Sequence, residues 1–270
     1  IKAGANYNID AKNNVYVNAG YYSKAPNFDA VFQDYDNYVT PDSDLTNEKV
    51  VGIEAGYGFR SSDLTMNLNV YRTSWKDRFL SDYVRINGVG GIANYTGVEQ
   101  VHQGVEFDAK WRISPLVDLE GMLTLGNYEY GSDVTDSNVT NNSGQSIGSA
   151  TLYLDGEKVG TTAHKTARLN LTVNPSDKFK FNLSLFHADD IFGTVNTEDF
   201  QDPEDTTMKL PSYELFDFGS SYTLSIGGKD VYLRLNINNL FDEEYYYMSR
   251  NNVIATPTTP TYKGIPLNAK

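Results

Sequence analysis

The residues best suited to chemistry are acidic side chains grouped in one polar stretch near the start of the chain. Four aspartates gather there: Asp34, Asp36, Asp42 and Asp44. Carboxylate oxygens are the ligands that Ca²⁺ prefers, so this stretch could hold a calcium ion. The spacing lacks the EF-hand pattern, and a solvated acidic loop is the interpretation that we favour. The sequence therefore predicts no metal site.

The histidines are a second place to look for chemistry. His102, His164 and His187 are far apart in sequence and fall on different predicted elements. His102 with Glu99 or Glu106 is the nearest approach to an acid–base pair, but no Ser, His and Asp occur at a useful spacing. We therefore predict ordinary strand or loop histidines, no catalytic residue and no cofactor. With no cysteine in the chain, disulfide and thiol chemistry are excluded.

Aromatic side chains in the predicted loops are the remaining candidates for a site. Ligand pockets combine aromatic walls with a few placed polar groups, so these residues could line an extracellular binding pocket. The same residues could equally be girdle residues or loop-packing residues, and both interpretations stay open. The candidates are Phe28, Phe32, Tyr35, Tyr38, Tyr83, Tyr95, Phe192 and Phe200.

Bulk composition narrows the class of protein that positions these residues. The chain has 270 residues, a net charge of −13 and a mean hydropathy of −0.46. Nucleic-acid binding would need a basic patch, so we expect no nucleic-acid partner. No apolar run approaches the length of a spanning helix, which excludes a helical membrane protein. A membrane β-barrel remains allowed, because only alternate residues of each strand face lipid.

Strict alternation of apolar and polar residues is the main structural signal. In Val231–Ile237 every second residue is apolar, which predicts a β-strand with one apolar and one polar face. We predict that this strand runs on to Tyr247 and ends in an aromatic cluster at a membrane interface. Similar alternation recurs along the chain and gives about ten strands.

The predicted connections alternate between short turns and long polar loops. Short turns are expected near Lys12, Ser62, Ser114, Ser176 and Gly228. Long loops are expected at 23–46, 81–98, 131–162 and 193–211, the third with its own hairpin turning at Asp155-Gly156. Short periplasmic turns and long extracellular loops are typical of an antiparallel up-and-down outer-membrane barrel.

The charged and aromatic residues of the strands fit the same arrangement. Six basic residues of the strands all fall on the polar face, as a lipid-facing wall requires: Arg60, Lys110, Arg112, Arg168, Lys180 and Arg234. They could attract an anionic ligand or pair with neighbouring carboxylates. Other aromatic residues are predicted to be interfacial anchors: Trp75, Trp111, Tyr128, Tyr130 and Tyr245 to Tyr247.

Several stretches resemble, in order and spacing, the C-terminal barrel half of TonB-dependent outer-membrane receptors. They are KAPNFDAVF (Lys24–Phe32), LTNEKVVGIEAGYGFR (Leu45–Arg60), NYTGVEQVHQGVEFDAKWR (Asn94–Arg112), AHKTARLNLTV (Ala163–Val173) and NINNLFDEEYY (Asn236–Tyr246). The resemblance implies a transmembrane 22-stranded barrel in a Gram-negative outer membrane. Residues 1–270 would be its C-terminal portion, with the plug domain and the last strand lying outside this chain.

The resemblance also implies what the whole protein does. Members of this family import a scarce small-molecule nutrient through a plugged barrel, powered by TonB acting on an N-terminal segment. A siderophore-like iron chelate is the family's default cargo, and TonB, outer-membrane lipids and the nutrient are the expected partners. The residues alone leave two other classes open, a passive porin or barrel adhesin and a soluble β-rich binding module.

Overall fold

The computed structural model describes residues 1–26, 45–195, 197, 200–249, 253–256, 259–262 and 266–269. All the regular elements in these residues are strands. The described residues contain no helix that is long and apolar enough to cross a bilayer. The strands are β1 (Lys2–Asn8), β2 (Asn13–Lys24), β3 (Glu48–Arg60), β4 (Leu64–Ile86), β5 (Val89–Ser114), β6 (Val117–Tyr130), β7 (Val134–Thr140), β8 (Ser146–Leu152), β9 (Ala163–Ser176), β10 (Phe179–Phe192), β11 (Thr206–Thr207), β12 (Lys209–Leu210), β13 (Tyr213–Ile226), β14 (Lys229–Ile237), β15 (Tyr245–Ser249), β16 (Val253–Thr256), β17 (Thr259–Tyr262) and β18 (Pro266–Ala269).

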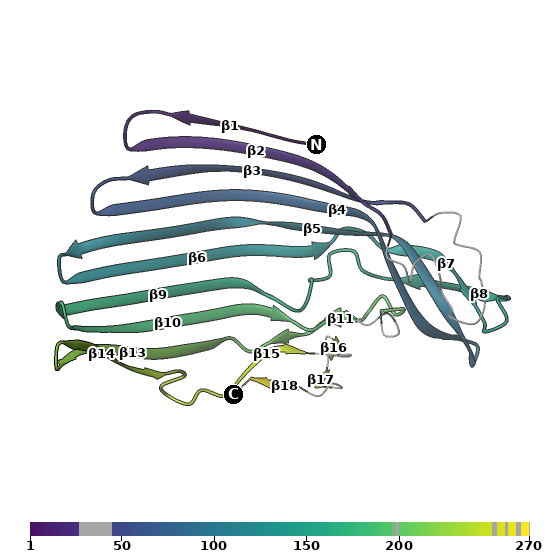
Figure 1. The fold of residues 1–270 in the computed structure, drawn as a ribbon. Helices are drawn as coiled ribbons and strands as arrows, with labels where there is room; N and C mark the ends of the chain where they lie inside the picture. Colours follow the sequence, from purple (N-terminus) through teal and green to yellow (C-terminus); the bar gives the residue numbers. More distant parts are fainter. Residues whose placement is uncertain are drawn as a thin grey trace.

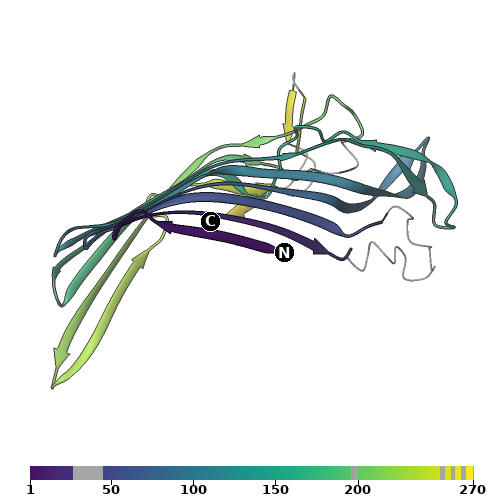
Figure 2. The ribbon, with the colours of Figure 1, turned by 90° about the horizontal axis from the view of Figure 1, so that it is seen from above.

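Ten of these strands form one antiparallel meander in the order β1-β2-β3-β4-β5-β6-β9-β10-β13-β14. Figure 1 shows the five short turns together at one end of the meander, and the longer connections at the other. The predicted fold class, strand number and turn positions are therefore confirmed. Figure 2 shows that the sheet is strongly curved and open. Three further strands extend it: β7 pairs with β5 and β8, and β12 pairs with β10, while β11 and β15 to β18 form two small separate sheets.

The two faces of the meander differ in chemistry, as the alternation predicts. Val70 pairs with Val105, which pairs in turn with Leu125, and 46%, 38% and 46% of these side chains are exposed. Because neighbouring residues point to opposite faces, Glu106 and Thr124 lie on the polar face. The isolated chain thus exposes a continuous apolar band that no other part of the described structure covers, as expected of a surface facing lipid.

The apolar band runs obliquely across the strands. It covers Val15–Tyr21 on β2 and Val231–Ile237 on β14. Followed through the residue pairings from β2 to β14, the centre of the band shifts along the strands by about ten residues. With a rise of about 3.3 Å per residue and a spacing of about 4.8 Å between strands, this shift corresponds to a strand tilt of about 40°. Transmembrane barrel strands tilt by about 35–45°. The strands therefore carry the register of a barrel wall.

The prediction of one continuous strand from Val231 to Tyr247 was wrong. β14 ends at Ile237 and β15 begins at Tyr245. Between them Asn239 and Asp242 have positive φ angles of 51° and 55°. The Asn239 side chain accepts from the Glu243 backbone N–H and donates to its carbonyl, both at 2.9 Å. These local side-chain bonds compete with the strand ladder and close a turn.

The predicted loop at 81–98 is also wrong, because these residues are strand. β4 continues to Ile86, β5 begins at Val89, and Asn87-Gly88 joins them with φ angles of 50° and 83°. Two residues with positive φ make the hairpin turn that matches strand twist. Beyond Trp75 the β4–β5 ladder shifts register at Asp77 and Gly97, whose φ angles are 57° and 80°. At these bulges the hairpin bends away from the main sheet (Figure 1).

The third long connection contains a hairpin, but its turn is not where the sequence pattern placed it. β7 pairs with β8, and the chain turns at 141–145, where Asn141 Oδ1 accepts from the backbone N–H groups of Ser143 and Gln145, each at 3.0 Å. Asp155-Gly156 forms a separate turn after β8. The strand segment before it already pairs with β7, so that turn does not close a hairpin.

The main hydrophobic core lies outside the meander, in a structure that we call the cap. The cap comprises the outer ends of β4 and β5 (80–98), the β7–β8 hairpin, and residues 153–160 and 200. Its fully buried side chains are Val84, Ala93, Tyr95, Val98, Val139, Leu152, Leu154 and Phe200. Asp133 Oδ1 accepts from the backbone N–H groups of Leu154 and Asp155 at 2.7 and 2.8 Å. The β4–β5 hairpin and the connection between β6 and β9 are thus folded together into one compact body, with Phe200 in its core.

Candidate functional site

A hollow of about 680 Å³ lies on the polar face of β1–β4. Its floor is a level of the wall where side chains are nearly absent. Gly20 pairs with Gly52, Gly52 with Thr73, and Thr73 with His102. Glycine in a strand interior marks a place where another group approaches the backbone closely. The volume is in the range of about 300–1,000 Å³ typical of small-molecule sites.

Tyrosine rings border the hollow above and below this floor. A Cβ added at Gly20 would lie 2.6 Å from a ring carbon of Tyr22, so that ring rests over the glycine. Tyr71 lies on the opposite border and its hydroxyl is 2.8 Å from the hydroxyl of Tyr128. This contact fixes the Tyr71 ring against the wall. The Tyr71 ring is therefore held in place, whereas the Tyr22 side chain is 52% exposed.

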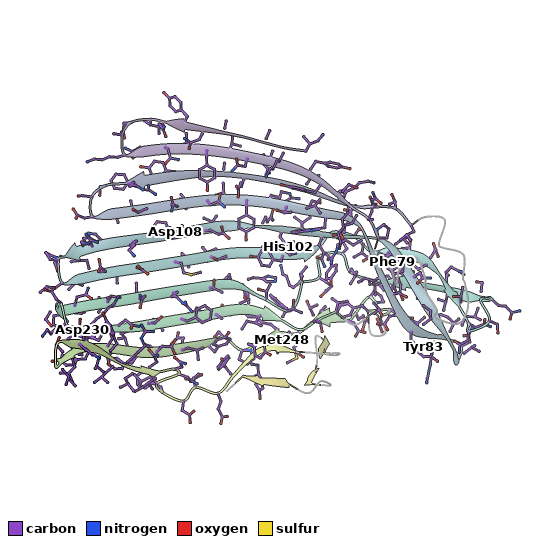
Figure 3. The ribbon with its side chains drawn as sticks, in the orientation of Figure 1. Phe79, Tyr83, His102, Asp108, Asp230 and Met248 are labelled. Atoms are coloured by element: carbon purple, nitrogen blue, oxygen red, sulfur yellow. The ribbon has the colours of Figure 1, made fainter. Side chains whose placement is uncertain are left out.

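One carboxylate without a cationic partner, Glu54, lines the lower border, and two more, Glu106 and Asp108, lie on β5 closer to the short turns. Glu54 accepts from the Asn18 amide at 2.8 Å, and Asp108, labelled in Figure 3, accepts from the Asn67 amide at 2.9 Å. Glu106 accepts from Asn69 at 3.4 Å. In the part of the chain that the structure describes, these three acids form no ion pair within 4.0 Å. This stretch of wall is therefore negatively charged.

Basic groups are distributed differently. Nearer the short turns, Lys110 pairs with Glu120 at 2.5 Å and Arg112 with Asp118 at 3.5 Å. Lys2 lines the hollow from β1, the edge strand, and is its only basic lining residue. The prediction that basic residues of the polar face pair with neighbouring carboxylates is confirmed for Lys110 and Arg112. Lys110 and Arg112 therefore do not neutralise the negative charge of Glu54, Glu106 and Asp108.

A row of five rings in contact continues the level of the floor across β4 to β10; one pair, His102–Tyr128, is stacked and the others are tilted. Centroids are 4.5 Å apart for Trp75–His102, His102–Tyr128 and Tyr128–His164, and 5.0 Å for His164–Phe192. The rings therefore pack against one another along the row, where the meander meets the cap.

The histidines of this row have packing roles in the structure. Tyr128 lies between His102 and His164, so these two imidazoles do not converge on a common point. His164 is 1% exposed and its Nε2 lies 2.8 Å from the Val159 carbonyl oxygen. His187 lies 3.3 Å from Glu214, on the same face of the sheet as the apolar band. Among the described residues, no three metal-ligating side chains gather in one place.

The eight aromatic candidates do not form one site in the described structure. Phe28, Phe32, Tyr35 and Tyr38, like the acidic stretch Asp34 to Asp44, lie outside the described residues. Tyr83 is 45% exposed on the β4–β5 hairpin (Figure 3), and Phe192 ends the ring row. Tyr95 and Phe200 come together in the cap core, 0% and 2% exposed. A ligand-binding role for these eight residues stays a prediction.

Two groups in the cap and at its junction with the wall have shifted pKa values. Burial raises the pKa of Tyr95 to about 12, with the nearby Asp82 charge adding to the shift. The Tyr95 hydroxyl has no hydrogen-bond partner among the described residues. Lys158, which hydrogen-bonds Glu129 just above the apolar band of β6, holds the pKa of that carboxyl below its usual value. This ion pair ties the cap to the wall.

Sequence reasoning missed the hollow, although a signal was present. Gly20, Gly52, Gly104 and Gly126 all fall at polar-face positions of their strands. A Cβ at Gly126 would lie 2.7 Å from the Tyr128 ring, which shows the same ring-over-glycine arrangement. Glycines repeated on one face of successive strands predict a thinned wall. The arrangement offers shape, aromatic surface and charge for binding, rather than a nucleophile with a base.

Comparison with known proteins gives a family match over most of the chain. Residues 2–240 match the family described as TonB dependent receptor-like, beta-barrel. The metal-pseudopaline receptor CntO of Pseudomonas aeruginosa is 34% identical over 84 residues, which are 30% of this chain and 11% of that protein.

Solved structures with the same fold are also receptors. The ferric-catecholate import receptor Fiu of E. coli K12 has a TM-score of 0.64 at 17% identity, covering 92% of this chain and 31% of that one. The siderophore receptor PiuA of Acinetobacter baumannii has a TM-score of 0.65 at 17% identity, covering 99% and 34%. The chain therefore spans about a third of the length of these receptors.

Proposed function

Since this chain belongs to the TonB-dependent receptor β-barrel family, we propose that it forms the C-terminal part of the barrel of an active outer-membrane importer. The family resides in the outer membrane of Gram-negative bacteria and consists of receptors and transporters rather than enzymes. The observation that carries the proposal is the match over residues 2–240. The strand tilt, the apolar band and the folded cap support it.

The cargo that we propose is a siderophore-like iron chelate. Support comes from the similar receptors, one named for ferric catecholates, one for siderophores and one for metal-pseudopaline. The hollow supports a cargo of drug-like size, because its 680 Å³ would take a substantial part of such a molecule. The wall supplies binding groups only, and no catalytic step is part of the proposal.

The energy source and the missing parts follow from the family and belong to the proposal. TonB would act through a region that precedes residue 1 in the whole protein, and a plug domain would occupy the lumen. Outer-membrane lipids would cover the apolar band, and the polar face would line the lumen. The competing class is a passive porin or adhesin with the same wall but no energised step.

Uptake of radioactive iron tests this function. The full-length protein is expressed in a Gram-negative host that lacks its own ferric-chelate receptors, with and without tonB. Iron-55 is supplied on a hydroxamate, a catecholate and a phenolate–thiazoline chelate. We expect accumulation of at least one complex, and only in the tonB-positive host. Equal uptake in both hosts would identify a passive pore, and surface binding without uptake an adhesin.

A further inference from the structure

We propose that the hollow on β1–β4 is a binding site, which we call the cation seat, for a cationic group of the imported ligand, an ammonium or a guanidinium. The inference rests on the proposed function, because it assumes that the ligand passes this wall. It goes further in assigning a charge to one part of the ligand. Four features carry it: the open floor at Gly52, the Tyr22 and Tyr71 rings, the Asn18 amide, and the Glu54 carboxylate, which has no ion pair among the described residues.

The shape of the hollow is the first argument. Gly52 leaves the wall without a side chain, and the Thr73 hydroxyl lies 3.5 Å from the place of a Cβ there, whereas the Tyr22 ring covers Gly20. Tyr22 and Tyr71 border this space on opposite sides. A group entering the hollow meets the Gly52 backbone and the lining side chains of Tyr22 and Tyr71. A compact head group suits this space.

The charge of the hollow is the second argument. Glu54 lies at its lower border and is bonded only by the uncharged Asn18 amide among the described residues. Glu106 and Asp108 extend the same negative field along the wall. Rings attract cations through their faces, and a carboxylate beside them adds to that attraction. A cationic group is therefore the ligand chemistry that all four features accept.

Lys2 is the one lining group that argues for an anion instead. It stands on β1 at the level of Gly20, two strands away from Glu54, and no ion pair joins them. The site could therefore have opposite charges at its two ends. We assign the cation to the Glu54 end because Glu54 is the only carboxylate among the described residues that lines the hollow, and its neighbours at that end are the Asn18 amide and Tyr71.

Charged thiol reagents test the field inside the hollow without knowledge of the cargo. This chain has no cysteine, so Thr73→Cys places a single thiol in the hollow. The full-length protein in native outer membranes is treated with a trimethylammonium-ethyl and a sulfonatoethyl methanethiosulfonate. Relative to a free thiol, we expect the cationic reagent to react about tenfold faster than the anionic one. Adding Glu54→Gln should abolish the preference, while Asp155→Asn, in an exposed turn of the cap, should leave it unchanged.

Protection by a small cation then tests binding itself. Agmatine, which carries a guanidinium, should slow the reaction of the thiol several-fold, whereas the uncharged N-butylacetamide should not. Glu54→Gln should remove the protection, and Lys2→Ala should keep or strengthen it. If the full-length protein imports no iron in the uptake assay, but the thiol still shows this pattern of reactivity and protection, the proposed function is refuted and the cation seat is not.

Several results would overturn the cation seat. They are a preference for the anionic reagent, a preference unaffected by Glu54→Gln, and no protection by agmatine. A thiol that reacts with neither reagent would show that a polypeptide segment fills the hollow, and would also reject a seat for the ligand.

Discussion

Replacing Leu169 by arginine tests whether the apolar band faces lipid. Leu169 lies near the middle of the band on β9, paired with Gly121 on one side and Leu185 on the other. Its side chain is 47% exposed, and its Cδ1 lies 3.8 Å from the place of a Cβ on Gly121. The leucine therefore covers the glycine on one side and would meet lipid on the other.

The expected cost follows from these contacts. An arginine on the lipid face costs about 2–4 kcal/mol near the bilayer midplane. Loss of the leucine's contacts over Gly121 adds about 1 kcal/mol, because about half of its side chain is covered. We therefore expect Leu169→Arg to lower the free energy of unfolding by about 3–5 kcal/mol.

The neighbouring position supplies a matched control. Asn170 lies at the same depth on the polar face and pairs with Glu120 across the sheet. An arginine there can approach a carboxylate in a wet environment, so Asn170→Arg should change stability by less than about 1 kcal/mol. The two variants differ in the face that the same charge occupies, with depth and strand held constant.

Reversible unfolding in phospholipid vesicles measures both variants. The full-length protein is titrated with guanidinium chloride, and tryptophan fluorescence, to which Trp75 and Trp111 contribute, reports the transition. A Leu169→Arg variant as stable as Asn170→Arg would refute the reasoning, because the band would then be facing water or protein. A large loss in both would show that the wall tolerates no arginine at this depth, and would leave no evidence for a lipid-facing side.

Three further expectations concern other parts of the chain. Tyr95→Phe removes a buried hydroxyl that has no partner among the described residues, so it should stabilise the cap by about 1 kcal/mol, measured by hydrogen exchange at the cap strands. Gly56→Ala would bring a Cβ 2.3 Å from the Tyr16 ring and should lower the midpoint of thermal unfolding, at a cost of about 1–3 kcal/mol, whereas an unchanged midpoint would mean that the ring moves freely. The Glu129–Lys158 pair lowers the pKa of Glu129 from its ordinary value of 4.5, so its contribution is fully present above that pH and is lost as the pH falls through the lowered pKa. Protease nicking of the cap should therefore increase in acid, and Glu129→Gln should remove that part of the pH dependence.

The faces of the strands could be predicted from the sequence because solvent and lipid decide them residue by residue. Alternation at Val105 and Leu125, with Glu106 and Thr124 opposite, needs no knowledge of neighbouring strands. Strand ends were harder to predict. At Asn239 the apolar and aromatic pattern continues, but hydrogen bonds between one side chain and the backbone of Glu243 stop the strand.

Glycine residues explain two failures of the prediction: the β4–β5 hairpin was predicted as a loop, and the hollow was not predicted. In the β4–β5 hairpin, Gly90 looked like a loop residue, but the Tyr83 ring lies over it and compensates for the missing side chain. The hollow arises because Gly20 and Gly52 happen to be paired, and pairing is known only from the register. A site that is formed where side chains are absent on paired strands is therefore difficult to predict from the sequence of each strand alone.

The strand tilt, which the oblique apolar band records, determines how much the diameter of such a barrel changes when strands are added. At a tilt of about 40°, each strand takes up about 6 Å of circumference, so one added hairpin widens a closed wall by about 4 Å in diameter. Bore can therefore change only in coarse steps when strands are gained or lost. Finer adjustment must come from single side chains, and a glycine exchanged for alanine at the floor of the hollow would narrow the passage locally by about 1.5 Å, the length of one carbon–carbon bond. Selectivity among ligands of similar size would thus be set one residue at a time on a wall of fixed strand number.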